Sequence, residues 1–179
     1  VNLNGGTLTA DQISYQKGGA NFNFDGGTLK ASASESAFME NLSAATVEFG
    51  GAIIDSNGYD IEIGQALLDG GEGGGLNKRG TGTLTLSGTN TYTGETQISD
   101  GATLAVTGGE AIADTSVINN LSPETFILNA DETIGGLKGT GWGKGVLNKR
   151  IPGRHTDFIF PVMAEETGFL GTAAFVGLY

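Results

Sequence analysis

Few residues in this sequence are of types that could perform catalysis. The single histidine, His155, stands two residues before Asp157, and with a serine the two could form a nucleophile–base–acid arrangement. No Gly-x-Ser-x-Gly or other nucleophile motif supports this, and the absence of cysteine excludes thiolate chemistry. We interpret His155 as an exposed loop residue, expect no catalytic residue, cofactor or metal site, and predict that the protein is not an enzyme.

Oxygen ligands for a cation occur together in one short segment. Asp55, Asn57, Asp60 and Glu62 carry the carboxylate and amide oxygens that Ca²⁺ prefers. Gly58, however, stands at the fourth place of this segment instead of the sixth, and Asn-Gly is a common tight-turn dipeptide. We favour a turn and leave open whether Asp55, Asn57 and Asp60 bind calcium.

Other apparent motifs are weak. Residues 139–143 resemble a glycine-rich phosphate loop but lack its Gly-Lys-Ser/Thr ending. Trp142 and Tyr92 could stack on sugar rings, although Tyr92 belongs to a repeated pattern and is interpreted as structural.

The composition narrows the class of protein. Of 179 residues, 32 are glycine, and the formal net charge is −11. An acidic chain is a poor partner for nucleic acid or an anionic membrane, so we expect neither nucleic-acid binding nor membrane insertion. The charge is uneven, because residues 1–137 hold 4 basic and 17 acidic side chains whereas residues 138–179 hold 5 and 3.

Internal repeats predict the fold. Residues 2–10 (NLNGGTLTA) recur as residues 23–31 (NFDGGTLKA), a shift of 21, and Thr-Leu recurs with a spacing of 20 at residues 83–84 and 103–104. Each unit is a short strand with alternating apolar residues, such as Val47 and Phe49, followed by a glycine-rich corner. One unit cannot bury its apolar side, but stacked coils can, and Thr and Asn in register can form ladders between them. We predict an all-β chain, a right-handed parallel β-helix (β-solenoid).

One stretch carries a family resemblance. Residues 76–106 read LNKRGTGTLTLSGTNTYTGETQISDGATLAV and closely resemble the autotransporter-associated β-strand repeat, with Glu95 where glycine is common. The resemblance is strong over 76–106 and weak over 1–137. It implies a parallel β-helix of the autotransporter passenger type, displayed or secreted at a bacterial surface.

Two segments break the pattern. Residues 33–42 (ASESAFMENL) place Phe38, Met39 and Leu42 on one helical face, so we expect a short helical insertion there. Residues 138–179 are first basic and then apolar, and we expect them to form a C-terminal capping or inter-subunit docking segment after a solenoid of residues 1–137. The residues proposed for self-association are Lys144, Lys149, Arg150, Arg154, Phe158, Phe160, Phe169, Phe175 and Tyr179.

These features lead to one functional expectation with two alternatives. We predict a non-enzymatic extracellular structural protein, a β-solenoid subunit of a surface scaffold, adhesin or fibre assembled by end-to-end strand stacking. The alternatives are a polysaccharide-binding or Ca²⁺-dependent polysaccharide-cleaving passenger domain, and an inert spacer from a longer precursor. Expected partners are copies of itself, as a homo-oligomer or filament, and surface glycans. The expected location is extracellular or the bacterial surface, after removal of an N-terminal signal.

Overall fold

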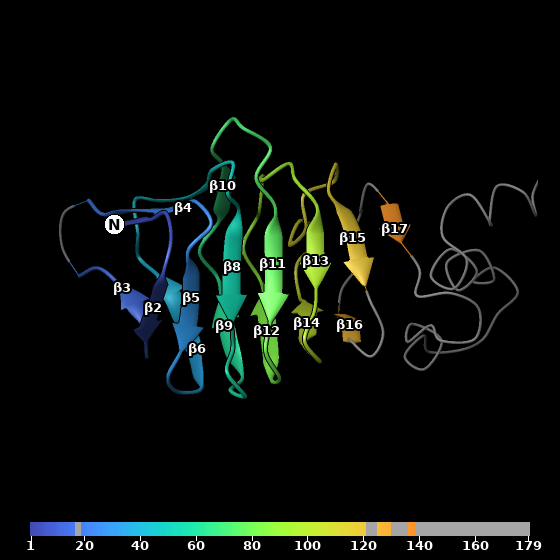
Figure 1. Cartoon of the computed structure of the whole chain (residues 1–179), viewed down its shortest axis with the longest axis horizontal. Helices are drawn as coiled ribbons and strands as arrows, with labels where there is room; N and C mark the ends of the chain where they lie inside the picture. The colour runs from blue at the N-terminus through green and yellow to red at the C-terminus, as the bar shows by residue number, and fades with distance from the viewer. Residues whose placement is uncertain (17–18, 121–124, 130–135, 139–179) are drawn as a thin grey trace, which may run out of the picture.

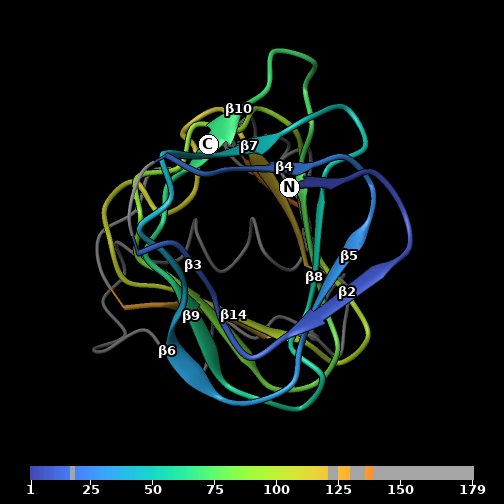
Figure 2. The same ribbon diagram turned by 90° about the vertical axis from the view of Figure 1, so that its left-hand side faces the viewer.

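The protein is a parallel β-solenoid. The computed structural model describes residues 1–16, 19–120, 125–129 and 136–138, in which every regular element is a strand (Figure 1). Seen from the N-terminal end, the chain winds clockwise as it recedes from the viewer, which makes the solenoid right-handed (Figure 2). The predicted fold class is confirmed.

Three parallel sheets form the sides of the solenoid. The four-stranded sheet has the order β1 (Asn2–Leu3), β4 (Asn21–Phe24), β7 (Ala44–Val47) and β10 (Leu67–Asp69). The seven-stranded sheet contains β2 (Thr7–Ala10), β5 (Thr28–Ala31), β8 (Ala52–Asp55), β11 (Leu76–Arg79), β13 (Thr96–Ile98), β15 (Val117–Asn120) and β17 (Gly136–Lys138). The six-stranded sheet contains β3 (Ile13–Ser14), β6 (Glu35–Glu40), β9 (Ile61–Ile63), β12 (Thr83–Leu86), β14 (Thr103–Val106) and β16 (Thr125–Leu128).

The strand register follows the sequence repeats. Thr7 pairs with Thr28, which is the shift of 21 between the first two units. Thr83 pairs with Thr103, which is the shift of 20. Because identical residues of successive coils lie opposite each other, their inward side chains stack in columns along the axis.

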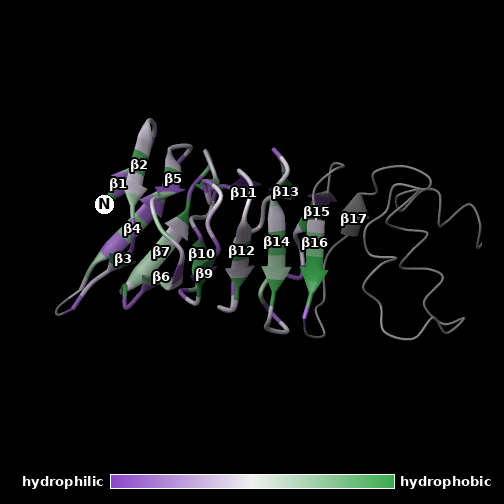
Figure 3. Ribbon diagram, turned by 90° about the horizontal axis from the view of Figure 1, so that it is seen from below, coloured by the Kyte–Doolittle hydropathy of each residue, from purple (hydrophilic) through white to green (hydrophobic). Residues whose placement is uncertain are grey.

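The core is a set of such columns. Leu84 of β12 pairs with Ile61 of β9 and Leu104 of β14, and all three side chains are buried. The column continues to Phe126 of β16, a strand that stands out as hydrophobic in Figure 3. Burial on this repeating pattern supplies the driving force that a single coil lacks.

Polar ladders connect the coils on the outer side, as predicted. Asn23 Nδ2 donates to Asn2 Oδ1 at 2.9 Å, and Thr46 Oγ1 donates to Asn23 Oδ1 at 2.7 Å. A second ladder joins Asn77 Nδ2 to Gln97 Oε1 at 3.0 Å.

The expected helix at residues 33–42 is wrong. Residues Glu35–Glu40 form strand β6, which pairs with β9 through an irregular register between Glu35 and Met39. A bulge of this kind lets the successive side chains of Phe38 and Met39 both be fully buried. A ten-residue helix is marginal alone, whereas the strand gains ladder hydrogen bonds on both sides.

The expectation that Val47 and Phe49 share one strand face is also wrong. Strand β7 ends at Val47, which is buried, and Gly51 N donates to Glu48 O at 2.8 Å in the corner that follows. Phe49 lies in this corner with 76 % of its surface exposed.

The proposed capping or docking segment, residues 138–179, lies outside the described residues except for Lys138, the last residue of β17. Within the described part of the chain, no helix has the length and hydrophobicity that a membrane span requires.

Candidate functional site

The segment with candidate cation ligands forms a tight turn. Asn57 and Gly58 both have positive φ, 54° and 88°, as the Asn-Gly dipeptide predicts. Asp55 Oδ1 accepts a hydrogen bond from Asn57 N at 2.8 Å, which closes the turn after β8. Asp60 Oδ1 accepts one from Thr83 N at 2.8 Å, which ties the turn to the next coil.

A buried lysine stabilises the corner beside this turn. Lys78 lies in β11 with its side chain directed into the solenoid and fully buried. Its Nζ donates to Ser56 Oγ at 2.7 Å, to Arg79 O at 2.6 Å and to Gly80 O at 2.8 Å. Burial lowers the pKa of Lys78 from 10.5 to about 8, although the negative charges of Asp55 and Asp60 act in the opposite direction.

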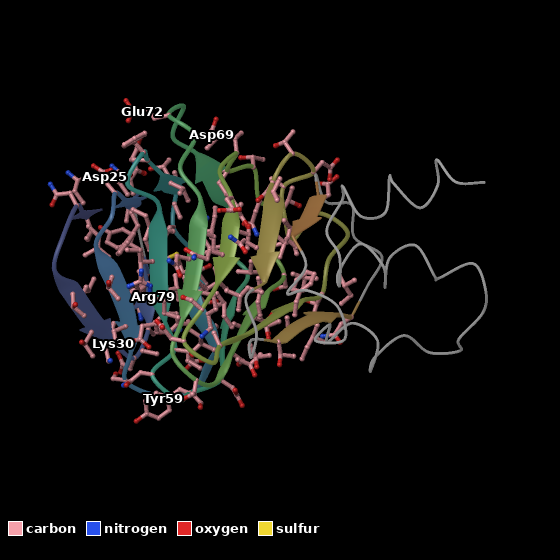
Figure 4. The ribbon with its side chains drawn as sticks, turned by 45° about the vertical axis from the view of Figure 1, so that its right-hand side comes forward. Asp25, Lys30, Tyr59, Asp69, Glu72 and Arg79 are labelled. Carbon is pink, nitrogen blue, oxygen red and sulfur yellow. The ribbon has the colours of Figure 1, made fainter. Side chains whose placement is uncertain are left out.

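Asp55 forms an ion pair at the surface of the same corner. Its Oδ2 accepts from Lys30 Nζ of the preceding coil at 2.8 Å. Partial burial would raise the pKa of Asp55, but hydrogen bonds from Lys30 and Asn57 and the positive charges of Lys30 and Lys78 outweigh it, so that pKa lies below its usual value. Figure 4 shows Lys30 toward one edge of the strands, with Asp25, Asp69 and Glu72 at the other.

This arrangement is suited to holding a corner together. An amine with a pKa near 8 is a potential nucleophile or base, but Lys78 is inaccessible and already donates to three acceptors. Both carboxylate oxygens of Asp55 accept hydrogen bonds, from Lys30 and Asn57, and Asp60 Oδ1 accepts one from Thr83. Among the described residues, no group of three or more carboxylate or imidazole side chains is arranged to hold a metal ion.

Tyr92 is structural, as its place in the repeat indicates. Its side chain is fully buried, and its hydroxyl shares a 2.7 Å hydrogen bond with Thr96 Oγ1. Thr96 Oγ1 also bonds Ser116 Oγ at 3.0 Å, and Ser116 Oγ donates to Gly94 O at 2.8 Å. Tyr92 therefore links neighbouring coils and is inaccessible to a sugar.

The other candidates lie in the tail. His155, Asp157, Trp142 and residues 139–143 are outside the described residues. So are the nine residues proposed for self-association: Lys144, Lys149, Arg150, Arg154, Phe158, Phe160, Phe169, Phe175 and Tyr179. Self-association of the chain stays a prediction.

The sequence analysis missed Lys78 as a buried residue, and it placed Phe49 in a strand instead of on the exposed corner. A signal for Lys78 was present, because it occupies the inward position two residues after Leu76, where the alternation calls for an apolar side chain. No comparable signal marked Phe49, because a residue in the corner after a strand can point either way.

Comparison with known families gives two matches in different parts of the chain. The passenger-associated-transport-repeat model matches residues 76–106. This confirms the repeat that the sequence analysis identified there. The FtsW/RodA/SpoVE cell cycle protein model matches residues 130–179. No solved structure matches the chain.

Curated relatives are cell-wall enzymes. The probable peptidoglycan glycosyltransferase FtsW of Caulobacter vibrioides is 46 % identical over 55 residues, 30 % of this chain and 14 % of the relative. The peptidoglycan glycosyltransferase MrdB of Escherichia coli K12 is 49 % identical over 47 residues, 25 % of this chain and 13 % of the relative. The probable peptidoglycan glycosyltransferase FtsW of Halothiobacillus neapolitanus is 48 % identical over 46 residues, which are 25 % of this chain and 11 % of the relative. The chain thus spans only a small part of the length of these relatives.

These matches correct three expectations. The predicted non-enzymatic structural role and the prediction that the protein is not an enzyme are contradicted, because the relatives are glycosyltransferases. The predicted extracellular location is contradicted as well, because residues 130–179 match the FtsW/RodA/SpoVE cell cycle protein model. The chain therefore combines a segment similar to the passenger-associated transport repeat with a segment similar to peptidoglycan glycosyltransferases.

Proposed function

We propose that this protein takes part in the synthesis of peptidoglycan glycan strands, and that residues 130–179 are the part of the chain that carries this role. The observation that supports the proposal is the match of those residues to the FtsW/RodA/SpoVE model, together with 46–49 % identity to FtsW and MrdB over short stretches. Because these relatives are peptidoglycan glycosyltransferases, the resemblance supports a role for the segment in glycosyl transfer during cell-wall assembly.

The segment works as one part of a larger catalytic unit. The chain covers 11–14 % of the length of the FtsW and MrdB relatives described above. A glycosyltransferase must bind donor and acceptor and hold their reacting atoms in line, which takes groups from several elements. We therefore expect residues 130–179 to function when joined to the remaining elements of such an enzyme.

A segment exchange tests the proposal. In a Caulobacter vibrioides strain depleted of its own FtsW, a chimera would carry residues 130–179 in place of the aligned FtsW segment. We expect the chimera to restore division, and a chimera with the same residues in shuffled order to fail at equal abundance on an immunoblot. A chimera that reaches the abundance of native FtsW in membranes without restoring division would refute the proposal.

We also infer that residues 1–137 form one passenger-type β-helix, of which residues 76–106 are the best-preserved unit. The support is the common register, since β2, β5 and β8 pair in the same sheet as β11 and β13 of the matched repeat. On this view the solenoid ends with β17 (Gly136–Lys138), which also lies within the match to the FtsW/RodA/SpoVE model, and the chain divides after that strand. Limited trypsin digestion with mass spectrometry tests it: we expect early cleavage between Lys138 and Arg154, and early cleavage within the solenoid would contradict the division.

A further inference from the structure

The most exposed aromatic side chain in the described residues borders a small hollow on the side of the solenoid. Phe49, 76 % exposed, lies at the corner between β7 and β8. The hollow beside it has a volume of about 260 Å³ and crosses three neighbouring coils, from Ile53 to Asn77 to Gln97. At a strand spacing of about 4.8 Å, three coils present a surface about 10 Å long.

Glycines line part of the hollow because adjacent coils approach each other closely there. Gly50, Gly51 and Gly75 line it. Gly51 has a φ of +77°, a conformation that disfavours other residues, and a Cβ added there would lie 2.9 Å from Gly75 O.

The amide side chains of Asn77 and Gln97 also line the hollow. Asn77 Nδ2 donates to Gln97 Oε1 at 3.0 Å, and Ser99 Oγ donates to Asn77 Oδ1 at 3.1 Å. These two bonds engage the carbonyl oxygens of both amides, and an amide also carries an NH₂ group that can donate to a ligand. Both amide side chains are half-buried, so their orientation is set before any ligand arrives.

The negative charge around the hollow disfavours anionic ligands. The exposed carboxylate residue Glu95 lines the hollow, and Asp25 Oδ1 accepts from Gly50 N at 2.9 Å at its edge. Asp25 lies on the same edge of the rod as Asp69 and Glu72 (Figure 4). No lysine or arginine lines the hollow. Nucleic acids and polyuronates would be repelled.

We propose that the hollow at Phe49 is a binding site for an uncharged N-acetylated sugar unit of a peptidoglycan glycan strand. The ring of Phe49 packs against the apolar face of a sugar ring, as exposed aromatic side chains do with flat apolar surfaces. The amides of Asn77 and Gln97 hydrogen-bond its hydroxyl and N-acetyl groups. This inference rests on the proposed function, because it takes the glycan from the enzymes that residues 130–179 resemble.

The test measures binding of the full chain to protein-free Escherichia coli peptidoglycan sacculi by co-sedimentation, and to the tetramer of N-acetylglucosamine by calorimetry. We expect Phe49→Ala and Gln97→Leu each to weaken both by about tenfold. Because Phe49 is so exposed, its replacement should leave the circular dichroism spectrum and the melting temperature unchanged. The matched control is Tyr59→Ala, which removes an aromatic side chain, 37 % exposed, from a different corner and should not change binding.

Several results would overturn the site. Binding that is unchanged in Phe49→Ala would do so, as would an equal loss in Tyr59→Ala. Loss of a dimer in Phe49→Ala, measured by analytical ultracentrifugation with glycan binding intact, would assign the hollow to contact between copies instead. The segment exchange gives a separate readout: if the chimera restores division while Phe49→Ala binds normally, the site is wrong and the proposed function stands.

Discussion

Raising the pH from 8 to 10 is expected to stabilise the solenoid through Lys78. In the folded chain burial lowers the pKa of this amine to about 8, whereas in the unfolded chain it returns to 10.5. Between these values the unfolded state binds a proton that the folded state does not. The free energy of unfolding therefore rises with pH across this window, and this contribution is lost as the pH falls through 8.

The magnitude follows from the width of the window. Each unit of pKa difference corresponds to about 1.4 kcal/mol, so the full effect approaches about 3 kcal/mol. The negative charges of Asp55 and Asp60 oppose the effect of burial, so the pKa stays above 7 and the residue is charged at pH 7. The charged amine donates hydrogen bonds to Ser56 Oγ, Arg79 O and Gly80 O.

Guanidinium denaturation followed by far-UV circular dichroism at pH 7, 8, 9 and 10 measures the effect. Lys78→Met removes the buried charge together with its three hydrogen bonds, so its stability at a single pH combines opposing contributions. The diagnostic quantity is the slope against pH, which Lys78→Met should flatten. Arg79→Met is the matched control, because Arg79 is an exposed cation on the same strand and its replacement should leave the slope unchanged.

Two results would refute this reasoning about Lys78. The first is a wild-type slope between pH 8 and 10 that equals the slope of Lys78→Met, since the amine would then titrate alike in both states. The second is an equal flattening in Arg79→Met, which would show that the slope reflects general surface charge.

Three further predictions concern the core, the buried tyrosine and the surface ion pair. Leu84→Ala should lower the free energy of unfolding by about 3 kcal/mol, because it opens a cavity in a buried column. The control Leu128→Ala, at a half-exposed position, should lower the free energy of unfolding by less than about 1 kcal/mol. If denaturation shows equal losses for Leu84→Ala and Leu128→Ala, the buried column does not contribute as described. Tyr92→Phe should cost about 1–2 kcal/mol, because a buried hydrogen-bonding partner is lost; a melting temperature equal to wild type would argue against that bond. Lys30→Met should raise the pKa of Asp55, so the variant loses less stability than wild type as the pH falls below 4; an unchanged Asp55 titration by NMR would contradict the pairing.

The repeats in the sequence were enough to predict the solenoid. A shift of 21 between residues 2–10 and 23–31 became the pairing of Asn2 with Asn23 and Thr7 with Thr28. A strand that recurs at a nearly constant interval can bury its apolar side only by stacking, so few architectures remain. The Asn57-Gly58 turn could also be predicted from the sequence, because it depends only on the backbone preferences of these two residues.

The tail shows what composition alone leaves out. Residues 138–179 differ in charge and hydrophobicity from the repeats, and that contrast was interpreted as a cap or docking segment. Comparison matches residues 130–179 to the FtsW/RodA/SpoVE cell cycle protein model, which composition did not reveal, and the capping or docking role stays a prediction. Composition reports how polar a segment is, whereas kinship depends on the order of its residues.

The tertiary structure decided the features that depend on neighbouring coils. Residues Glu35–Glu40 form a strand because β3 and β9 offer ladder partners on both sides, which no helical pattern in residues 33–42 reveals. Lys78 is buried because Ser56 and two carbonyl oxygens from a corner converge on its amine. Phe49 is exposed because the chain turns after Val47. Alternation within a strand is a local property, but the partner of a corner or an edge is set by a coil about 20 residues away.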